Sequence, residues 1–366
     1  MGDNRAGRLL RSVKRAAYLV AVAPAVGRLP AVLGYRMACW RGDWHFRCQA
    51  GKRTEMARNL RLVLGDELSP AAAQQVTREW FRLGSCGAVD VMRLRRGTRP
   101  LRQLVEIRGQ EHLEAALAAG KGALVCTGHF HSHDIGFSLL HATGFPVTTI
   151  GRRGYNYDAD ISSAERWLWE LYVRPMRRYR QRPIIEPWPG RPQVAVLAAA
   201  ALRANEVVRV TIDAPPLEGD QARAVEVPFL GRQARLLPGA VTLARLTGAP
   251  LLMGLVYRAA DYRHQVLEIS APVPVDGDIK TVFERCAAEV SATIRTNPAN
   301  WGFWPETGNL VTMGLIPTQR DGSPAAEAVP RPPARLLHHD GSADSVPAQG
   351  RPVPAARSQR LRLPRA

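Results

Sequence analysis

The hydrophobic and polar positions after residue 108 alternate between two patterns. Short apolar runs bounded by Gly, Pro or charged residues, such as ALVCTG (123–128) and VVRVTID (207–213), are typical of buried strands. Longer segments with apolar residues at helical spacing, such as RPQVAVLAAAALRANE (191–206), indicate helices. The predicted strands are 123–128, 146–151, 207–213, 250–258 and 264–270, and helices are predicted inside 111–120, 158–179, 191–206, 239–248 and 281–298. This alternation predicts an α/β sandwich with a largely buried sheet.

The first 108 residues are predicted to form helices. One is expected in GKRTEMARNLRLVLG (51–65) and another in SPAAAQQVTREWFRLGSCGAVDVMRL (69–94). In the second helix we expect Ser69 at the N-cap and Pro70 at the first helical position. Apolar residues at helical spacing, among them Trp80, are predicted core positions of this helix.

The end of the chain has a different composition. Residues 318–366 are rich in Pro, Ala and Arg, with few large apolar residues and no period. Such a segment cannot bury enough apolar surface to offset the entropy lost on ordering, so a disordered tail is predicted. We therefore divide the chain into a basic helical region (1–64), an α/β core (65–317) and the tail (318–366).

The charge of the chain points to an anionic partner. The formal net charge is +18, which favours nucleic acid or an anionic membrane surface. Residues 1–64 hold 13 basic and three acidic residues beside aromatics such as Trp40 and Trp44, a combination typical of proteins that lie on anionic bilayers. A solvated basic face is the alternative. A nucleic-acid-binding protein is disfavoured, because the chain has no zinc-finger, RRM-like or helix-turn-helix signature.

No apolar run in the sequence is long enough for a spanning helix, which needs about 18 or more residues. The nearest is AAYLVAVAPAV (16–26), which we interpret as an interfacial anchor or as an ordinary buried helix. The five cysteines are scattered and contain no CxxC pair, a pattern typical of a reducing compartment without a thiolate zinc site.

The stretch GHFHSHDIG (128–136) places three histidines and an aspartate in six consecutive positions. One hypothesis is a metal site on His129, His131 and His133, which would make the protein a metal-dependent hydrolase. Metal sites need about three or four ligands in fixed geometry, and further histidines are scarce downstream. The metal site is therefore the alternative interpretation and not the first.

The first interpretation is a single base, His129, oriented by Asp134. On a regular helix, five steps of about 100° would separate the two side chains by about 140°. They can meet if His129 ends the strand or loop and Asp134 lies in the first helical turn. The carboxylate then accepts the N–H of one imidazole nitrogen and leaves the other nitrogen to take a proton, which suits acyl transfer to a hydroxyl. Because the spacing alone matches many sequences, a structural histidine is the alternative.

Several motifs in the same order resemble one family. GHFHSHDIG is similar to the GHF-x3-E/D block of the lipid A lauroyl/myristoyl acyltransferases, a branch of the lysophospholipid acyltransferase superfamily whose relatives include the phosphatidylinositol mannoside acyltransferases. The block 225–258 resembles the family's V-x-V-P-F-F-G, P-G, L-A and T-G-A-P motifs, and NPANWGFWPE (297–306) resembles its H/N-P-x-x-W segment. The resemblance covers residues 10–310 and implies a mixed central sheet flanked by helices, as in glycerolipid acyltransferases, with a helical N-terminal region.

The resemblance implies roles for individual residues of this chain. His129 would be the general base and Asp134 its orienting partner. Arg152 would bind the anionic head of the acceptor or stabilise developing negative charge, with a plain surface arginine as the alternative. Glu226 would line the site or be an outward strand residue, and Asp213 is expected to close a turn. The lipid A branch commonly has Glu at the position of Asp134, so the acceptor need not be a lipid A precursor.

The implied function is O-acyl transfer at a membrane surface. A fatty acyl group would move from acyl-CoA or acyl carrier protein to a hydroxyl of a glycolipid or phosphoglycolipid, without a metal or organic cofactor. The expected partners are an anionic membrane surface, the lipid acceptor and acyl carrier protein, with no nucleic acid. The protein is expected to be a monomer at the cytoplasmic face of the bacterial plasma membrane, bound peripherally.

Overall fold

The structure is a computed structural model, and it describes residues 22–65, 68–151, 184–187, 193–216 and 219–317, with the single residues 167, 170, 174 and 176. Four sequence-based predictions therefore lie wholly or mostly outside the described residues: the role of Arg152, the helix inside 158–179, the tail 318–366 and the first part of the anchor 16–26.

The centre of the protein is a six-stranded sheet with the order β1-β8-β7-β2-β4-β3. Neighbouring strands are parallel except β7 and β8, which are antiparallel, so the predicted mixed sheet is confirmed. Its strands are β1 (Val105–Arg108), β2 (Ala123–Thr127), β3 (Val147–Ile150), β4 (Val207–Thr211), β7 (Leu251–Arg258) and β8 (Gln265–Ile269). All five residues of β2 are buried, as the continuous apolar run predicts for a strand covered on both faces.

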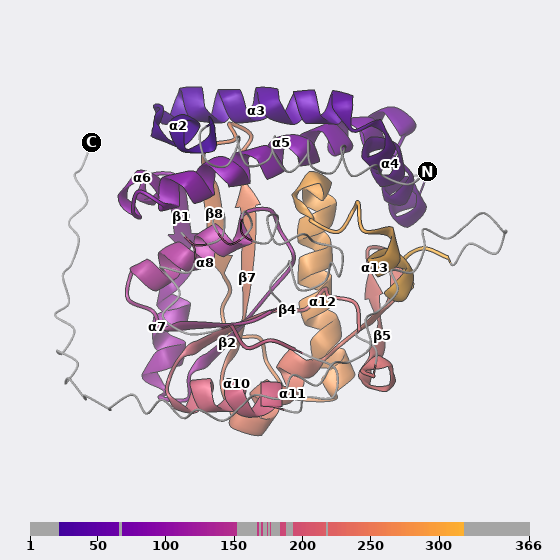
Figure 1. Ribbon diagram of the computed structural model, residues 1–366. Helices are drawn as coiled ribbons and strands as arrows, with labels where there is room; N and C mark the ends of the chain where they lie inside the picture. The colour runs from indigo at the N-terminus through magenta and orange to yellow at the C-terminus, as the bar shows by residue number, and fades with distance from the viewer. Residues whose placement is uncertain are drawn as a thin grey trace, which may run out of the picture. The chain divides into compact units, whose positions relative to one another are not determined.

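Helices cover this sheet as the alternating pattern predicts. They are α7 (Gln110–Ala118), α8 (His133–Ala142), α10 (Gln193–Arg203), α11 (Gly239–Thr247) and α12 (Ile279–Thr296). Helix α8 packs against β1, β7 and β8, whereas α10 packs against β3 and β4. Figure 1 shows α12 running beside β7 and places α10 and α11 at the lower end of the sheet.

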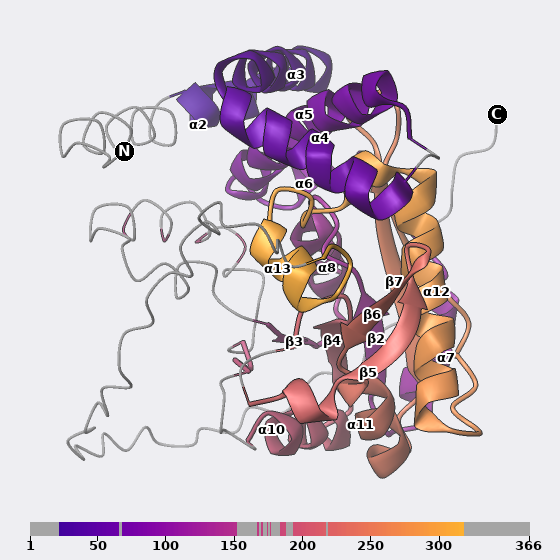
Figure 2. The ribbon, with the colours of Figure 1, turned by 90° about the vertical axis from the view of Figure 1, so that its right-hand side faces the viewer.

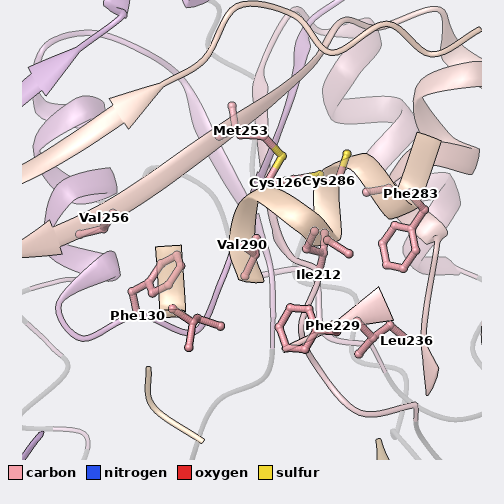
Figure 3. Close-up of a cluster of buried hydrophobic side chains, with 14 of the residues drawn as sticks. Cys126, Phe130, Ile212, Phe229, Leu236, Met253, Val256, Phe283, Cys286 and Val290 are labelled. Atoms are coloured by element: carbon pink, nitrogen blue, oxygen red, sulfur yellow. The ribbon is translucent and has the colours of Figure 1, made fainter. Parts of the chain in front are cut away.

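A second, two-stranded sheet lies against α12. Its antiparallel strands β5 (Val225–Phe229) and β6 (Arg232–Leu236) are joined by Leu230 and Gly231, which both have positive φ. Two such residues are typical of the hairpin turn whose twist matches that of the flanking strands. Phe229 and Leu236 are buried, and Figure 3 shows them beside Ile212 and Phe283 in the main core.

The N-terminal region is helical, as predicted, with α2 (Ala23–Arg28), α3 (Ala31–Cys48), α4 (Ala50–Leu64), α5 (Pro70–Leu94) and α6 (Arg99–Arg102). Ser69 caps α5, because its Oγ accepts the Ala72 N–H at 3.2 Å, and Pro70 is the first helical residue. The prediction that all of residues 1–108 are helical is wrong at its end: β1 pairs with β8. Four residues are too short for alternation to mark a strand, and pairing with β8 decides it.

Helix α3 has two contrasting faces. Gly34, Ala38 and Gly42 are buried and pack against α5 so closely that a Cβ on Gly42 would lie 2.6 Å from Arg82 Cα. The exposed side chains include four apolar ones at helical spacing, which we call the apolar stripe: Leu33, Met37, Trp40 and Trp44. Figures 1 and 2 both place α3 at the upper surface, above α5. Within the described residues, no helix combines the length and apolar character that a membrane span requires.

Candidate active site

Two neighbouring parallel strands bring His129 and Asp213 together. Strands β2 and β4 are paired in register, with Thr127 opposite Thr211 at their carboxyl ends. His129 and Asp213 each lie two residues beyond these positions, and the pairing continues between them through the Ile212 N–H, which donates to the Thr127 carbonyl at 3.0 Å. In open α/β sheets this carboxyl edge is where ligands commonly bind.

The Asp213 carboxylate fixes the His129 imidazole. Its Oδ1 lies 2.6 Å from His129 Nδ1, and its Oδ2 accepts the His129 backbone N–H at 2.8 Å and the Trp301 Nε1–H at 2.7 Å. Because an ionised carboxylate only accepts, Nδ1 carries the proton and Nε2 is the nitrogen able to take one. The imidazole is 29% exposed, whereas Asp213 is fully buried.

The pKa of Asp213 lies below its usual value. Burial by itself raises this pKa, but the attraction of the His129 imidazole outweighs burial, together with hydrogen bonds from His129 and Trp301. The carboxylate is therefore held ionised beside the histidine at neutral pH, in the state that can orient the ring and stabilise an imidazolium.

The segment after α12 holds the loop between β2 and α8, residues 128–132, from the other side; we call this loop the histidine loop. It contains η5 (Pro298–Asn300), and its Trp301 forms an isolated antiparallel bridge with Phe130. The Asn300 carbonyl accepts the His131 N–H at 2.8 Å, and the Gly302 N–H donates to the His129 carbonyl at 2.7 Å. A Cβ on Gly302 would lie 3.0 Å from that carbonyl oxygen, so this close approach favours glycine.

Aromatic side chains anchor and flank the loop. Phe130 is buried, and Figure 3 shows it in the core near Val256 and Val290. Gly128 leaves room for it, since a Cβ there would lie 2.9 Å from the Phe130 ring. The ring of Phe303 lies against His129 with 4.3 Å between ring centroids. The loop therefore presents His129 from a backbone that is fixed on both sides.

The carboxylate that hydrogen-bonds His129 is thus Asp213 and not Asp134, the partner expected from the sequence. Asp134 does lie in the first turn of α8, but its Oδ1 accepts from Arg209 Nη1 at 2.8 Å. Arg209 is a buried residue of β4 whose guanidinium lies over the Phe137 ring, so a nearby carboxylate compensates its charge. The role of Asp134 in catalysis stays a prediction; among the described residues it forms no hydrogen bond or ion pair with His129.

The other two histidines have separate surroundings. His131 packs edge-on against Trp80, with ring centroids 5.1 Å apart, and burial lowers its pKa to about 3. His133 donates from Nδ1 to the Phe130 carbonyl at 2.5 Å, and burial lowers its pKa to about 4. In the described part of the chain, no three His, Cys, Asp or Glu side chains converge as metal ligands would. His131 and His133 thus make different hydrogen-bond and ring contacts, and within the cluster His133 Nε2 lies 3.8 Å from Asp134 Oδ1.

The remaining predicted site residues are not brought to His129. Glu226 is exposed on β5, opposite Arg235 in the two-stranded sheet, and among the described residues it makes no hydrogen bond or ion pair with His129 or Asp134. Its expected place near the dyad stays a prediction. Arg152 lies outside the described residues.

The expectation that Asp213 merely closes a turn is incomplete, because this residue contacts the candidate base directly. A sequence signal for it exists: both VCTGH and VTID place a titratable residue two positions after a buried strand. That signal becomes informative only when the two strands are known to be neighbours. The resulting arrangement, an ionised carboxylate, an imidazole and a partly exposed Nε2, can remove a proton from a hydroxyl.

Comparisons with known proteins show which family and which relatives this chain resembles in sequence. A sequence model of the family described as "Bacterial lipid A biosynthesis acyltransferase" matches residues 7–166 and 190–304. The chain is 30% identical over 293 residues to a phosphatidylinositol mannoside acyltransferase of Mycobacterium tuberculosis (strain CDC 1551 / Oshkosh), covering 76% of this chain and 83% of the relative. It is 26% identical over 275 residues to the protein of that name from Mycolicibacterium smegmatis, covering 70% of this chain and 79% of the relative.

Proposed function

The chain belongs to the bacterial lipid A biosynthesis acyltransferase family, and from this premise we propose that it moves a fatty acyl group from a thioester to a hydroxyl of a phosphoglycolipid. It is an acyltransferase of lipid or glycolipid biosynthesis by family. The main support for acyl transfer with His129 as the base is the 2.6 Å contact between His129 Nδ1 and the buried, ionised Asp213. It leaves His129 Nε2 as the proton acceptor for an attacking hydroxyl.

The proposed step needs no covalent enzyme intermediate. The acceptor hydroxyl gives its proton to His129 Nε2 while its oxygen forms a bond to the thioester carbonyl carbon. The carbon–sulfur bond then breaks, and the imidazolium returns the proton to the departing thiolate. Asp213 stabilises the transient positive charge on the ring and keeps Nδ1 protonated, so that the same nitrogen always faces the substrate.

The acceptor class is inferred from the relatives. Those named above are phosphatidylinositol mannoside acyltransferases, a name that describes a phosphatidylinositol carrying mannose. We propose an acceptor of the same kind, a membrane phosphoglycolipid with sugar hydroxyls. Arg152, whose guanidinium is permanently charged and can donate two hydrogen bonds, would contact the phosphate of the acceptor. The thioester donor would be acyl-CoA or acyl carrier protein.

The apolar stripe supports a membrane-surface location for the proposed function. Leu33, Met37, Trp40 and Trp44 of α3 are exposed, and Arg28, Arg36 and Arg47 are exposed nearby on α2 and α3. Apolar side chains bordered by arginines suit the interface of an anionic bilayer. We propose that this surface lies on the cytoplasmic face of the plasma membrane and meets the proposed lipid acceptor there.

The test is a transfer assay with purified protein, acyl-CoA and vesicles that contain phosphatidylinositol mannosides, followed by mass spectrometry of the lipids. We expect one acyl chain to be added to the glycolipid, and His129→Ala to lower the rate by about 10²–10⁴-fold, the usual contribution of a general base. The exposed His264→Ala, remote in sequence, is the control for loss of a histidine. Free fatty acid as the only product would contradict acyl transfer. Full activity of His129→Ala would contradict the role of His129 as the base.

A further inference from the structure

A buried polar cluster lies next to the histidine loop, centred on Asp90 of α5. Asp90 is fully buried, and its Oδ1 accepts from the Tyr35 hydroxyl at 2.5 Å. Its Oδ2 accepts from Ser132 Oγ at 3.0 Å, from Gln265 Nε2 at 3.0 Å and from the Arg258 guanidinium. A charge that is fully buried must be compensated in this way, and here α3, α5, β7, β8 and the histidine loop all contribute.

Ser132 is the point at which this cluster reaches the histidine loop. It lies between His129 and Asp134, directly before α8, with φ 62° and ψ 13°. Residues other than glycine rarely adopt this left-handed backbone conformation, so contacts from the surrounding structure must stabilise it. Ser132 Oγ donates to Asp90 Oδ2 at 3.0 Å and accepts from Arg258 Nη2 at 3.0 Å, which fixes the hydroxyl from two sides.

The loop is therefore fastened at both ends. Asp213 and Gly302 hold His129 at its start, and Asp90 with Arg258 holds Ser132 three residues later. The turn over residues 130–133 is closed by the His133 N–H, which donates to the Phe130 carbonyl at 3.3 Å. A shift of Ser132 would be passed along three peptide units to the imidazole.

We propose that Asp90 and Arg258 are positioning residues for acyl transfer: by clamping the Ser132 hydroxyl they fix the left-handed turn and so the orientation of His129. This inference rests on the proposed role of His129 as the base. Neither residue touches the imidazole, so their effect is exerted through Ser132. Tyr35 extends the clamp to α3, the helix that carries the apolar stripe.

The chain offers a pair of variants that disturbs this clamp without removing a buried charge. Gly87 and Gly84 both lie inside α5. A Cβ on Gly87 would lie 3.1 Å from Ser132 Oγ, which is tight against a hydroxyl held by two partners, whereas a Cβ on Gly84 would meet only His131 Cε1 at an ordinary 3.6 Å. Alanine in place of glycine favours a helix in both cases, so neither variant should unfold the protein.

We expect Gly87→Ala to lower kcat at least about tenfold with less than about a twofold change in KM for the thioester, because orientation affects the transition state and not ground-state binding. Gly84→Ala should keep the wild-type kcat. Gly84→Ala should melt at or above the wild-type temperature, and Gly87→Ala should still unfold in one cooperative transition. Wild-type kcat in Gly87→Ala, or equal losses in the two variants, would overturn the proposal.

A second readout does not depend on transfer. In nitrogen-15 spectra of labelled protein, wild-type His129 should be one tautomer, protonated at Nδ1. We expect Gly87→Ala to shift or broaden this signal and Gly84→Ala to leave it in place. No change in either variant would overturn the proposal that Asp90 and Arg258 fix the orientation of His129 through Ser132. Absence of transfer by the wild-type protein would instead count against the proposed function, so the two failures are distinguishable.

Variants of the serine itself separate its hydroxyl from its backbone. Ser132→Gly tolerates the left-handed conformation but lacks the hydroxyl, and Ser132→Ala lacks the hydroxyl and also disfavours the conformation. We expect kcat to fall in both, and further in Ser132→Ala. Wild-type kcat in Ser132→Gly would show that the clamp has no role in catalysis.

Discussion

His129 and Asp213 occupy matching positions, two residues beyond the ends of neighbouring parallel strands, and His129 Nδ1 lies 2.6 Å from Asp213 Oδ1. The sheet thereby joins two side chains that are 84 residues apart in the sequence. The rigid part of the fold, and not the loop sequence alone, supplies the carboxylate partner of the candidate base. This relationship distinguishes Asp213 from Asp134, the carboxylate that the sequence predicted for that role.

The two carboxylates can be compared directly. Asp213→Asn would place an amide N–H against a donor from His129 or Trp301, and so disturb the tautomer that leaves Nε2 free. We expect acyl transfer to fall by about 10²–10⁴-fold. Asp134→Asn weakens the pair with Arg209 instead, and we expect a smaller loss. Initial rates of both variants at saturating thioester decide which carboxylate orients His129. The reverse order of losses would restore Asp134 as the orienting acid.

The half-buried histidines His131 and His133 predict a loss of stability in acid. Unfolded histidine has a pKa of about 6.5. Burial lowers the folded pKa to about 3 for His131 and to about 4 for His133. As the pH falls below about 6.5, the unfolded chain binds protons that the folded protein does not, so the free energy of unfolding decreases by up to about 1.4 kcal/mol per pH unit for each imidazole.

Urea unfolding of wild type and His131→Gln at about pH 7 and about pH 5 measures this effect. His131→Gln carries no titrating ring, so its free energy of unfolding should decrease less between the two pH values. This loss ends only below the folded pKa values of about 4 and about 3. Equal decreases in the two proteins would show that His131 is not the source.

The apolar stripe predicts membrane binding that depends on identified side chains. Trp40→Ser with Trp44→Ser should weaken binding to anionic vesicles, because both rings are exposed and have apolar surface to bury in the interface. Arg36→Gln and Arg47→Gln should each weaken it by about 1 kcal/mol, roughly fivefold.

Co-sedimentation with anionic and neutral vesicles at low and high salt is the measurement. Leu246→Ser is the matched control: this leucine is 79% exposed on α11, at the other end of the sheet (Figure 1). Its binding should equal that of wild type. Equal weakening by Leu246→Ser and the tryptophan variant would mean that α3 is not the contact surface.

The close packing of α3 on α5 gives a stability prediction. Gly42→Ala would place a Cβ 2.6 Å from Arg82 Cα, where backbone must move, so we expect a loss of about 1–3 kcal/mol in the free energy of unfolding. In Gly51→Ala of α4 the added Cβ has no neighbour within 4 Å, and no loss is expected. Chemical denaturation of both variants tests the difference. A stable Gly42→Ala protein would mean that α3 packs less tightly on α5.

The sequence alone determined those features that depend on neighbours along the chain. Apolar runs gave β2 and β4, helical spacing gave α5, and Ser69 with Pro70 marked its start, because periodicity and capping are local properties. The stretch around His129 identified the candidate base for the same reason. Motif order identified the family, which the comparison with known proteins confirmed.

Tertiary structure alone decided which groups meet. Strand order is set by packing of the whole sheet, so no local pattern could show that β2 lies next to β4 and that Asp213, rather than Asp134, reaches His129. The same holds for β1, which is a strand because β8 pairs with it, and for Ser132, whose left-handed turn is held by residues distant in the sequence. Long-range contacts of this kind are energetically decisive but leave no period in the sequence.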